Sequence, residues 1–240
     1  MNSNDRRLKP VVAIDGPAGS GKTTVSRLVA QRLGYVVLDT GALYRAIALA
    51  TSRAGLAPDA AELGPFCEAL VARSAIVLES LPDGEVRVLL DGEDVSSAIR
   101  TPEMSQRASE VSVVPGVRAA LLELQRRIGG SGGVVVEGRD IGSVVFPDAE
   151  AKFFLTASVE RRAERRFGEL RGAPNAPNLS SVLDQVVQRD RRDSERAVSP
   201  LVRARDAALM DSTHLGIDQV VDSIVDAVRR IESELAASNG

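Results

Sequence analysis

The chain has 240 residues, of which 44% are hydrophobic and 26% charged, and its formal net charge is −3. This length fits one elaborated domain with a full core, and the composition is that of an ordinary soluble globular protein. The slightly acidic balance and an aromatic content of 3% without Trp exclude an electrostatic or base-stacking surface for nucleic acid. A single cysteine, Cys67, and a single histidine, His214, exclude a disulfide framework and a zinc cluster.

The first residues of the sequence do not have the pattern of a signal peptide. Residues 1–10 are polar and charged and lack the apolar segment of a signal peptide. No apolar run approaches the ~20 residues that a helix needs to cross a bilayer. We therefore expect a cytoplasmic protein that has no membrane or nucleic-acid partner.

The most informative segment is the glycine-rich stretch 16–24, which reads GPAGSGKTT. It fits the phosphate-loop pattern G-x-x-x-x-G-K-[ST], in which backbone N–H groups converge on a polyphosphate. In this pattern Lys22 supplies charge to the β and γ phosphates, and the Thr23 hydroxyl binds Mg²⁺. The residues predicted to bind ATP are Gly16, Pro17, Ala18, Gly19, Ser20, Gly21, Lys22, Thr23 and Thr24.

The flanks of this loop support the assignment. The apolar run 11–14 before it predicts a buried strand. After it, Val25, Leu28, Val29 and Leu33 recur at helical spacing, and Gly34 is placed to cap the helix. The order strand, glycine loop, helix is the one that a phosphate loop requires.

The following segments alternate and then change character. A second strand is predicted at 35–38 and a helix at 43–53, and Asp59 is a candidate cap for a short helix that reaches about Val71. Three short β-like runs come next, with turns between them, and the Asp-Gly turn is a hairpin signal. The runs are 75–79, 85–90 and 93–95, and the turns are 82–84 and 91–92.

The C-terminal half returns to helices and buried strands. Thr101-Pro102 and Pro115 each begin a helix, and the second helix reaches about residue 128. A glycine-rich connector, 129–133, leads into the remaining elements. We predict strands at 134–136, 152–155 and 208–210, helices at 159–170, 180–195 and 218–235, and a loop at 171–178. Five apolar strands separated by helices predict an α/β protein with a five-stranded parallel sheet covered by helices.

Charged residues follow the strands predicted at 35–38 and 134–136, at the sheet edge where ligands bind in parallel sheets. Arg45 lies on the helix after the strand 35–38, and Arg139-Asp140 follow the strand 134–136. Arg189, Asp193 and Arg196 share one helix face in the C-terminal half. Surface or structural ion pairing is the alternative explanation for each of these groups.

A second cluster of arginines, 162, 165 and 166, precedes the Pro- and Asn-rich loop 171–178 and would suit a lid over phosphates. Together these groups predict phosphoryl transfer between two phosphate-bearing partners. A monophosphate acceptor has a second pKa of roughly 6, so it is already an anionic nucleophile at neutral pH and needs no catalytic base.

In four sequence blocks the chain resembles the bacterial cytidylate kinases, the CMP/dCMP kinases among the nucleoside monophosphate kinases. The blocks at 38–45 and 137–149 are more specific than the phosphate loop. The antiparallel meander fits the enlarged monophosphate-binding insert of this family. The four blocks are 14–24 (IDGPAGSGKTT), 38–45 (LDTGALYR), 137–149 (EGRDIGSVVFPDA) and 189–201 (RDRRDSERAVSPL).

The resemblance implies a role for each matching residue. Arg45, Arg139 and Arg196 would hold the acceptor phosphate, and Arg189 and Asp193 would contact the sugar. Thr40 stands where the family often has Ser, which keeps the hydroxyl at the CMP site. Cytosine would be read by Ser109, Arg118 and Asp140. The catalytic groups would be Lys22, Arg139, Arg196 and Arg162, the last closing over the donor.

The resemblance also implies a monomer that uses ATP with Mg²⁺ to phosphorylate CMP and dCMP. The whole chain, 1–240, would be a single P-loop kinase domain. Its core would span about 9–60 and 116–240, its monophosphate-binding insert about 61–115 and its lid about 160–178.

Two other readings remain open at this point. A kinase for another small acceptor, such as a different nucleoside monophosphate or shikimate, would share the phosphate loop. A nucleotide-dependent switch of the GTPase kind would need an Asp-x-x-Gly element and an Asn-Lys-x-Asp guanine reader, and the sequence contains neither.

Overall fold

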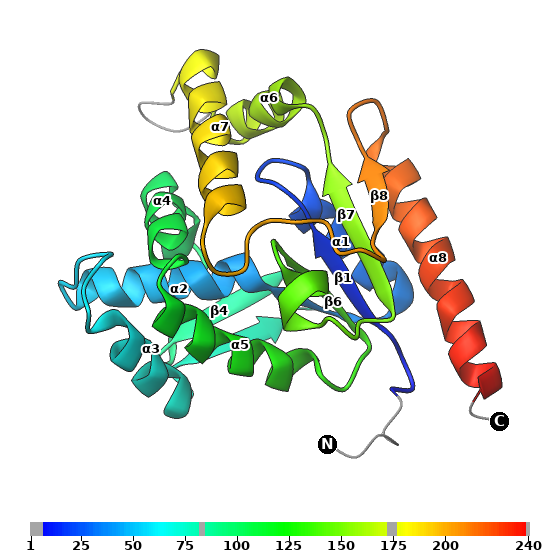
Figure 1. Ribbon diagram of the computed structural model, residues 1–240, viewed down its shortest axis with the longest axis horizontal. Helices are drawn as coiled ribbons and strands as arrows, with labels where there is room; N and C mark the ends of the chain where they lie inside the picture. Colours follow the sequence, from blue (N-terminus) through cyan, green and yellow to red (C-terminus); the bar gives the residue numbers. More distant parts are fainter. Residues whose placement is uncertain (1–6, 82–84, 172–176, 239–240) are drawn as a thin grey trace.

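Five parallel strands form the central sheet of the computed structural model, which describes residues 7–81, 85–171 and 177–238. Their order across the sheet is β2-β6-β1-β7-β8, with β1 in the centre (Figure 1). Every neighbouring pair runs parallel. The five predicted strands and their parallel arrangement are confirmed. They are β1 (Val11–Asp15), β2 (Val36–Asp39), β6 (Val134–Gly138), β7 (Ala151–Thr156) and β8 (Ala208–Asp211).

Alternate residues of the central strand β1 pack against helices on opposite faces of the sheet. Val12 and Ile14 of β1 belong to the hydrophobic cluster formed with α1 (Lys22–Leu33) and α8 (Ile217–Ser238). Val11 and Ala13 belong to the cluster on the other face, which includes residues of α2 (Thr40–Arg53) and α5 (Pro115–Gly129). Because both faces are covered, the strands read as continuous apolar runs.

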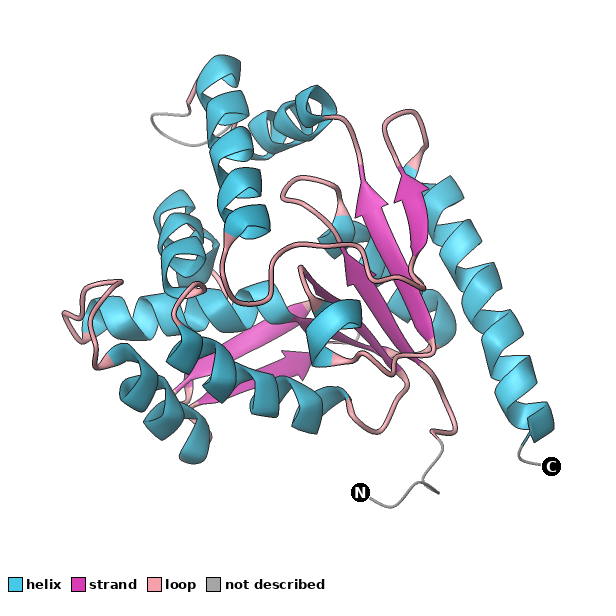
Figure 2. Cartoon of the chain, in the orientation of Figure 1, coloured by secondary structure: helices cyan, strands magenta, loops and turns pink. Residues whose placement is uncertain are grey.

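A second, antiparallel sheet lies beside the parallel one (Figure 2). It consists of three short strands in the order β3-β4-β5. They are β3 (Ile76–Ser80), β4 (Val86–Leu90) and β5 (Glu93–Asp94). Asp91 and Gly92 both have positive φ, 52° and 83°, as the predicted Asp-Gly hairpin turn requires. The other predicted turn, 82–84, lies outside the described residues.

The antiparallel sheet and its flanking helices share a core with the parallel sheet. The flanking elements are α3 (Leu63–Ala72), the short helix η1 (Ala98–Arg100) and α4 (Pro102–Val111). Val88, Ile99 and Val111 from this part lie in one cluster with Leu38 and Val136 of the parallel sheet. The division of the chain into core, insert and lid remains a prediction.

Helices α6 (Val159–Leu170) and α7 (Leu179–Glu195) pack on each other above the carboxyl ends of the strands (Figure 1). They are held together by a small cluster of their own, which contains Ala163, Leu170, Val182 and Val186. Asn178 caps α7 by accepting from the Ser181 N–H. Residues 172–176 of the predicted lid loop lie outside the described residues.

Three local features differ from the sequence prediction. Helix α2 begins at Thr40, earlier than predicted, because the Asp39 carboxylate accepts from the Ala42 N–H. The expectation that Asp59 caps the next helix is wrong. Two turns, closed by Ala60 N–H to Ala57 O and Leu63 N–H to Ala60 O, come first, and α3 starts at Leu63.

The third difference is a π-helical turn, η2 (Ile141–Val145), directly after the Arg139-Asp140 pair. No sequence pattern indicated it.

Among the residues that the structure describes, no helix is long and apolar enough to cross a membrane.

The contact between α3 and α5 provides a test of the shared core. Gly64 and Gly116 lie back to back there, and a Cβ built on Gly116 would come within 2.7 Å of the Gly64 Cα. We predict that Gly116→Ala lowers the free energy of unfolding by about 1–3 kcal/mol through overpacking. Gly168→Ala in α6, where a Cβ meets nothing within 4 Å, should instead stabilise the protein by about 0.5–1 kcal/mol. Urea denaturation of both variants measures the difference, and equal effects would contradict it.

Candidate active site

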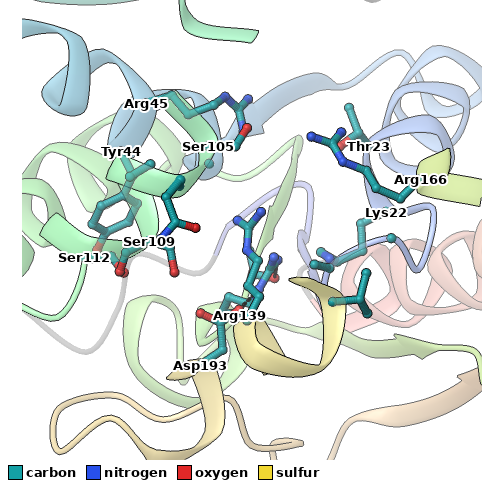
Figure 3. Close-up of a pocket in the computed structure, with 18 of the residues that line it drawn as sticks. Lys22, Thr23, Tyr44, Arg45, Ser105, Ser109, Ser112, Arg139, Arg166 and Asp193 are labelled. Carbon is teal, nitrogen blue, oxygen red and sulfur yellow. Dashed lines mark hydrogen bonds and ion pairs between the residues drawn. The ribbon is translucent and has the colours of Figure 1, made fainter. Parts of the chain in front are cut away.

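A pocket of about 590 Å³ opens at the carboxyl ends of the central strands, between the phosphate loop, α4 and α7 (Figure 3). Residues from both halves of the chain line it. The nine predicted CMP-binding residues all lie in this lining: Thr40, Arg45, Ser109, Arg118, Arg139, Asp140, Arg189, Asp193 and Arg196. From the phosphate loop the lining includes Ala18, Gly19, Gly21, Lys22, Thr23 and Thr24. The structure thus brings together groups that are up to about 180 positions apart in the sequence.

Two glycines explain the path of the phosphate loop. Gly16 has φ 152°, and a Cβ there would lie 1.9 Å from the Leu155 carbonyl oxygen, so no side chain fits. Gly21 has φ 91° and ends the loop, so that α1 begins at Lys22. The positive end of α1 therefore points into the pocket, where it favours phosphate. Gly16, Pro17 and Ser20, also predicted to bind ATP, are buried and do not line the pocket.

Lys22 and Glu137 form the charged centre beside the loop. The Lys22 amine donates to the Pro17 carbonyl oxygen at 2.8 Å, and one Glu137 oxygen, Oε2, accepts from the Thr23 hydroxyl at 3.0 Å. Burial and the neighbouring Arg139 lower the pKa of Lys22 well below its usual value. Burial, with the Asp39 carboxylate nearby, raises the pKa of Glu137 to about 7. The second oxygen, Glu137 Oε1, is buried and has no hydrogen-bond partner.

Arg139 and Asp193 form an ion pair that joins the end of β6 to α7. Arg139 Nε donates to Asp193 Oδ2 at 2.8 Å. Although burial opposes ionisation of both groups, each raises the stability of the other's charged form. The pKa of Arg139 lies above its usual value and the pKa of Asp193 lies below its own.

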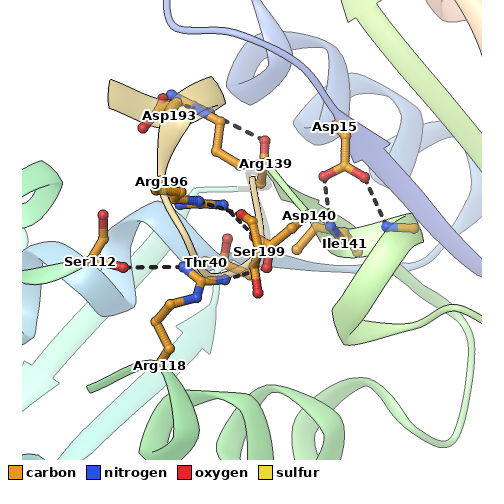
Figure 4. A network of polar contacts seen from close by, with 12 residues as sticks. Asp15, Thr40, Ser112, Arg118, Arg139, Asp140, Ile141, Asp193, Arg196 and Ser199 are labelled. Carbon is orange, nitrogen blue, oxygen red and sulfur yellow. Dashed lines mark hydrogen bonds and ion pairs between the residues drawn. The ribbon is translucent and has the colours of Figure 1, made fainter. Parts of the chain in front are cut away.

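Asp140 holds two further arginines (Figure 4). Its carboxylate accepts from Arg118 of α5 and, at 3.2 Å, from Arg196 at the end of α7. The Arg118 guanidinium also lies over the Tyr44 ring, 5.7 Å from its centroid. Ser109, on α4 beside them, has a buried hydroxyl with no partner. This end of the pocket is therefore polar, enclosed and partly unsatisfied.

Several buried nitrogen atoms of the lining have no hydrogen-bond partner. They are Nε of Arg45, Arg118, Arg189 and Arg192. Within the described residues Arg189 makes no ion pair, and burial together with Arg139 lowers its pKa to about 10. The Arg189 guanidinium without an ion pair and the unsatisfied Nε groups of Arg45, Arg118 and Arg192 favour a ligand that carries several anionic oxygens.

The arginines of α6 have three different environments. Arg162 is buried outside the pocket lining, where it donates to the Ala18 and Ala157 carbonyls and pairs with Asp190 at 2.6 Å. Arg165 donates to the Ser20 carbonyl and to Ser212. Arg166 alone among the three lines the pocket, on the same side as Lys22 and Thr23 (Figure 3).

Two predicted contacts already have protein partners. The Thr40 hydroxyl donates to the Glu137 carbonyl oxygen at 2.7 Å, and Arg45 pairs with Asp39 at 2.9 Å. Asp39 also caps α2, so Arg45 is held at the carboxyl end of β2, while its Nε has no hydrogen-bond partner.

The site contains residues that the sequence prediction did not select. Asp39 and Glu137 carry carboxylates beside the phosphate loop, and Tyr44 and Arg192 also line the pocket. Asp39 and Glu137 could have been found, because each directly follows a predicted strand at the ligand-binding edge. Arg192 could not, because its Nη2 reaches Gln106 of α4 across the pocket, a contact between residues 86 positions apart.

The fold and the pocket define the class of protein. A phosphate loop at the carboxyl edge of a five-stranded parallel sheet, facing a second arginine-rich site, belongs to a P-loop phosphotransferase. Similarity to known proteins gives the family. The family model described as cytidylate kinase matches residues 12–230.

Known relatives agree with the family model. A cytidylate kinase from Citrifermentans bemidjiense is 48% identical and covers 91% of this chain and 92% of its own. One from Geobacter sulfurreducens is 49% identical over 92% of this chain and 94% of its own. One from Symbiobacterium thermophilum is 46% identical over 96% of this chain and 100% of its own. The chain belongs to the cytidylate kinase family, and the predicted phosphotransferase class with a phosphate group as acceptor is confirmed.

The buried carboxylate of Glu137 predicts a pH dependence of stability. The pKa of Glu137 rises from its usual value of 4.5 to about 7 in the folded protein, so ionisation opposes folding. The stability from the protonated form is present below pH 4.5 and is lost as the pH rises through about 7. We predict that Glu137→Gln, which cannot ionise, loses less stability than the wild type between pH 6 and 8 without ligand. Loss of this carboxylate also lowers the pKa of Lys22 further, which acts in the same direction.

Thermal unfolding at the two pH values measures this effect. Glu103→Gln is the matched control, since Glu103 lines the same pocket but is exposed. Parallel pH profiles for wild type and Glu137→Gln would show that this carboxylate is not the group responsible.

Proposed function

We propose that the protein transfers the γ-phosphoryl group of ATP, with Mg²⁺, to CMP or dCMP, giving ADP and CDP or dCDP. The observation that carries the proposal is the buried Asp140 carboxylate held between Arg118 and Arg196, in the same pocket as the phosphate loop. A carboxylate fits the exocyclic amine of cytosine, and the surrounding guanidinium groups fit a monophosphate. Family membership supports the same substrates.

The donor lies over the phosphate loop in this proposal. Loop N–H groups and the start of α1 bind the β and γ phosphates, and Lys22 exchanges its contact with the Pro17 carbonyl for the phosphates. Glu137 and Thr23 fit a Mg²⁺ site, because Glu137 Oε1 is buried without a partner next to the Thr23 hydroxyl. Mg²⁺ when bound neutralises charge on the phosphates.

The acceptor lies across the pocket from the donor. Arg45, Arg139 and Arg196 hold its phosphate, and Arg189 with Asp193 contacts the sugar. Ser109, Arg118 and Asp140 read the base, and the free Ser109 hydroxyl supplies a further hydrogen bond. No catalytic base is required, because the acceptor phosphate is the nucleophile and the arginines orient and neutralise it.

Of the α6 arginines, Arg166 faces the donor in this proposal. Arg162, which we selected from the sequence as catalytic, supports the phosphate loop through the Ala18 carbonyl. The α6–α7 pair would close over the donor and keep water from the phosphoryl group. The protein would act as a cytoplasmic monomer without nucleic-acid or membrane partners.

A coupled assay of ADP formation with MgATP tests the proposal. CMP and dCMP should be the efficient acceptors, with UMP, AMP and shikimate far weaker. A preference for any of the last three would overturn the assignment and favour a kinase for another small acceptor.

Lys22→Ala tests the donor site. The Lys22 charge acts on the transferring phosphates, and among the described residues its amine donates only to Pro17 and Ser20 of the loop itself, so the fold should survive its loss. We predict that kcat falls below about a tenth of the wild-type value, with the melting temperature little changed. Lys9→Ala, at an exposed lysine, is the control. Retention of most turnover by the Lys22 variant would refute this role.

Asp140→Asn tests the base reader. Cytosine offers an amine donor where uracil offers a carbonyl acceptor, so a carboxylate matches one base and repels the other. We predict that Asp140→Asn lowers kcat/KM for CMP. The ratio of kcat/KM for CMP to kcat/KM for UMP, the CMP-over-UMP ratio, should fall by about tenfold or more. Asp193→Asn, which removes a sugar contact, should weaken both substrates equally. If the ratio stays the same in Asp140→Asn, Asp140 does not read the base.

A further inference from the structure

Asp15 is a buried carboxylate that the mechanism above does not use. It is the last residue of β1, directly before Gly16, and its side chain is 3% exposed. Its two oxygens accept from the backbone N–H groups of Ile141 and Gly142, each at 2.8 Å (Figure 4). These are the first two N–H groups of the π-helical turn, and they follow Asp140 in the chain.

Asp140 occupies the position from which a side chain normally caps such a turn. It is the residue before the first helical one, its φ of −141° is non-helical, and aspartate is a preferred cap. Its carboxylate nevertheless makes no capping hydrogen bond. It binds Arg118 and Arg196 on the pocket side instead. The cap comes from Asp15, 126 positions earlier in the chain than Ile141.

We propose that Asp15 is a positioning residue for acceptor recognition: by capping the turn after Asp140, it leaves the Asp140 carboxylate free to face the acceptor. This inference rests on the proposed function, in which Asp140 reads the base. Without Asp15, the turn has two unsatisfied N–H groups directly beside Asp140. Asp140 occupies the cap position, from which a carboxylate satisfies the Gly142 N–H, and in that role it would leave Arg118 and Arg196.

The surroundings of Asp15 agree with a carboxylate that is fixed in place. Burial raises its pKa to about 6 and Asp140 adds to this, while the two N–H groups and Lys22 oppose the rise. At neutral pH both oxygens can therefore accept hydrogen bonds. An asparagine has one acceptor oxygen and turns its NH₂ toward an N–H group, so it can cap only half of the turn.

Asp15→Asn tests the inference through a separation of the two substrates. We expect KM for CMP to rise about tenfold or more and the CMP-over-UMP ratio to fall, while KM for ATP changes by less than about twofold. Ser143→Ala is the matched control, because Ser143 lies in the same turn and its buried hydroxyl has no partner. Equal losses for ATP and CMP with an unchanged CMP-over-UMP ratio would overturn the proposal and leave Asp15 a purely structural residue.

A double-mutant cycle separates this inference from the proposed function. If Asp15 acts through Asp140, adding Asp15→Asn to Asp140→Asn should not narrow the ratio further. Independent, multiplying effects would overturn the inference. If Asp140→Asn alone leaves the ratio unchanged, the proposed base reader fails. If Asp140→Asn narrows the ratio and Asp15→Asn does not, only the inference about Asp15 fails.

A second variant covers a possible loss of stability. Asp15→Ser keeps one acceptor oxygen in a smaller side chain, and calorimetry of CMP binding to it needs no turnover. We expect CMP to bind about tenfold more weakly than to wild type, with binding of an ATP analogue retained. Unchanged CMP affinity in a folded Asp15→Ser protein would contradict the proposal.

Discussion

The structure depends on charge that is buried at the carboxyl edge of the parallel sheet. Lys22, Arg118, Glu137, Asp140 and Asp193 are each 4–7% exposed. An isolated ion in such a place costs several kcal/mol, so the fold must give each one a partner. Arg118, Asp140 and Asp193 are held in ion pairs, whereas Lys22 is held by the Pro17 carbonyl and Glu137 by the Thr23 hydroxyl.

Two ion-pair groups divide the acceptor side of the pocket. Arg139 with Asp193 joins β6 to α7, and Asp140 with Arg118 and Arg196 joins the π-helical turn to α5 and α7. Both groups include a residue of α7 or its end, so the position of α7 controls both. Because their dipoles and charges are oriented before a ligand arrives, little reorganisation is needed during the reaction. Arg189 lines the same pocket, half-buried and without an ion pair among the described residues, and leaves a charge for a ligand to neutralise.

The sequence predicts the sheet well because its determinants are local. Each of the five strands is a short apolar run. The phosphate loop is a contiguous motif whose glycines allow the backbone to approach a phosphate closely. The Asp-Gly turn of the antiparallel sheet is predictable for the same reason, since both residues tolerate positive φ. Part of the candidate site follows from the rule that ligands bind at the carboxyl edge of the sheet. This rule selected Arg45 after β2 and Arg139-Asp140 at the end of β6.

The features that the sequence does not predict depend on contacts between distant segments. The π-helical turn after Asp140 is capped from β1, and no local pattern around residues 141–145 encodes that contact. The start of α3 was misplaced because Asp59 is a good cap in general, but turns ending at Leu63 intervene. Arg162 belongs to an arginine cluster that precedes the predicted lid loop, as a lid arginine would. Its guanidinium nevertheless donates to the Ala18 carbonyl oxygen and pairs with Asp190.

These distant contacts share one target, the phosphate loop. Asp15, at the start of the loop, reaches the turn that carries Asp140, and Arg162 and Arg165 reach the Ala18 and Ser20 carbonyls from α6. The loop is therefore held from the acceptor side and from the α6–α7 side at once. Its own N–H groups must remain open for phosphate, so these ties use carbonyl oxygens and a flanking side chain instead. A rigid loop with free N–H groups is what a phosphate-binding site requires, and the neighbouring elements supply that rigidity.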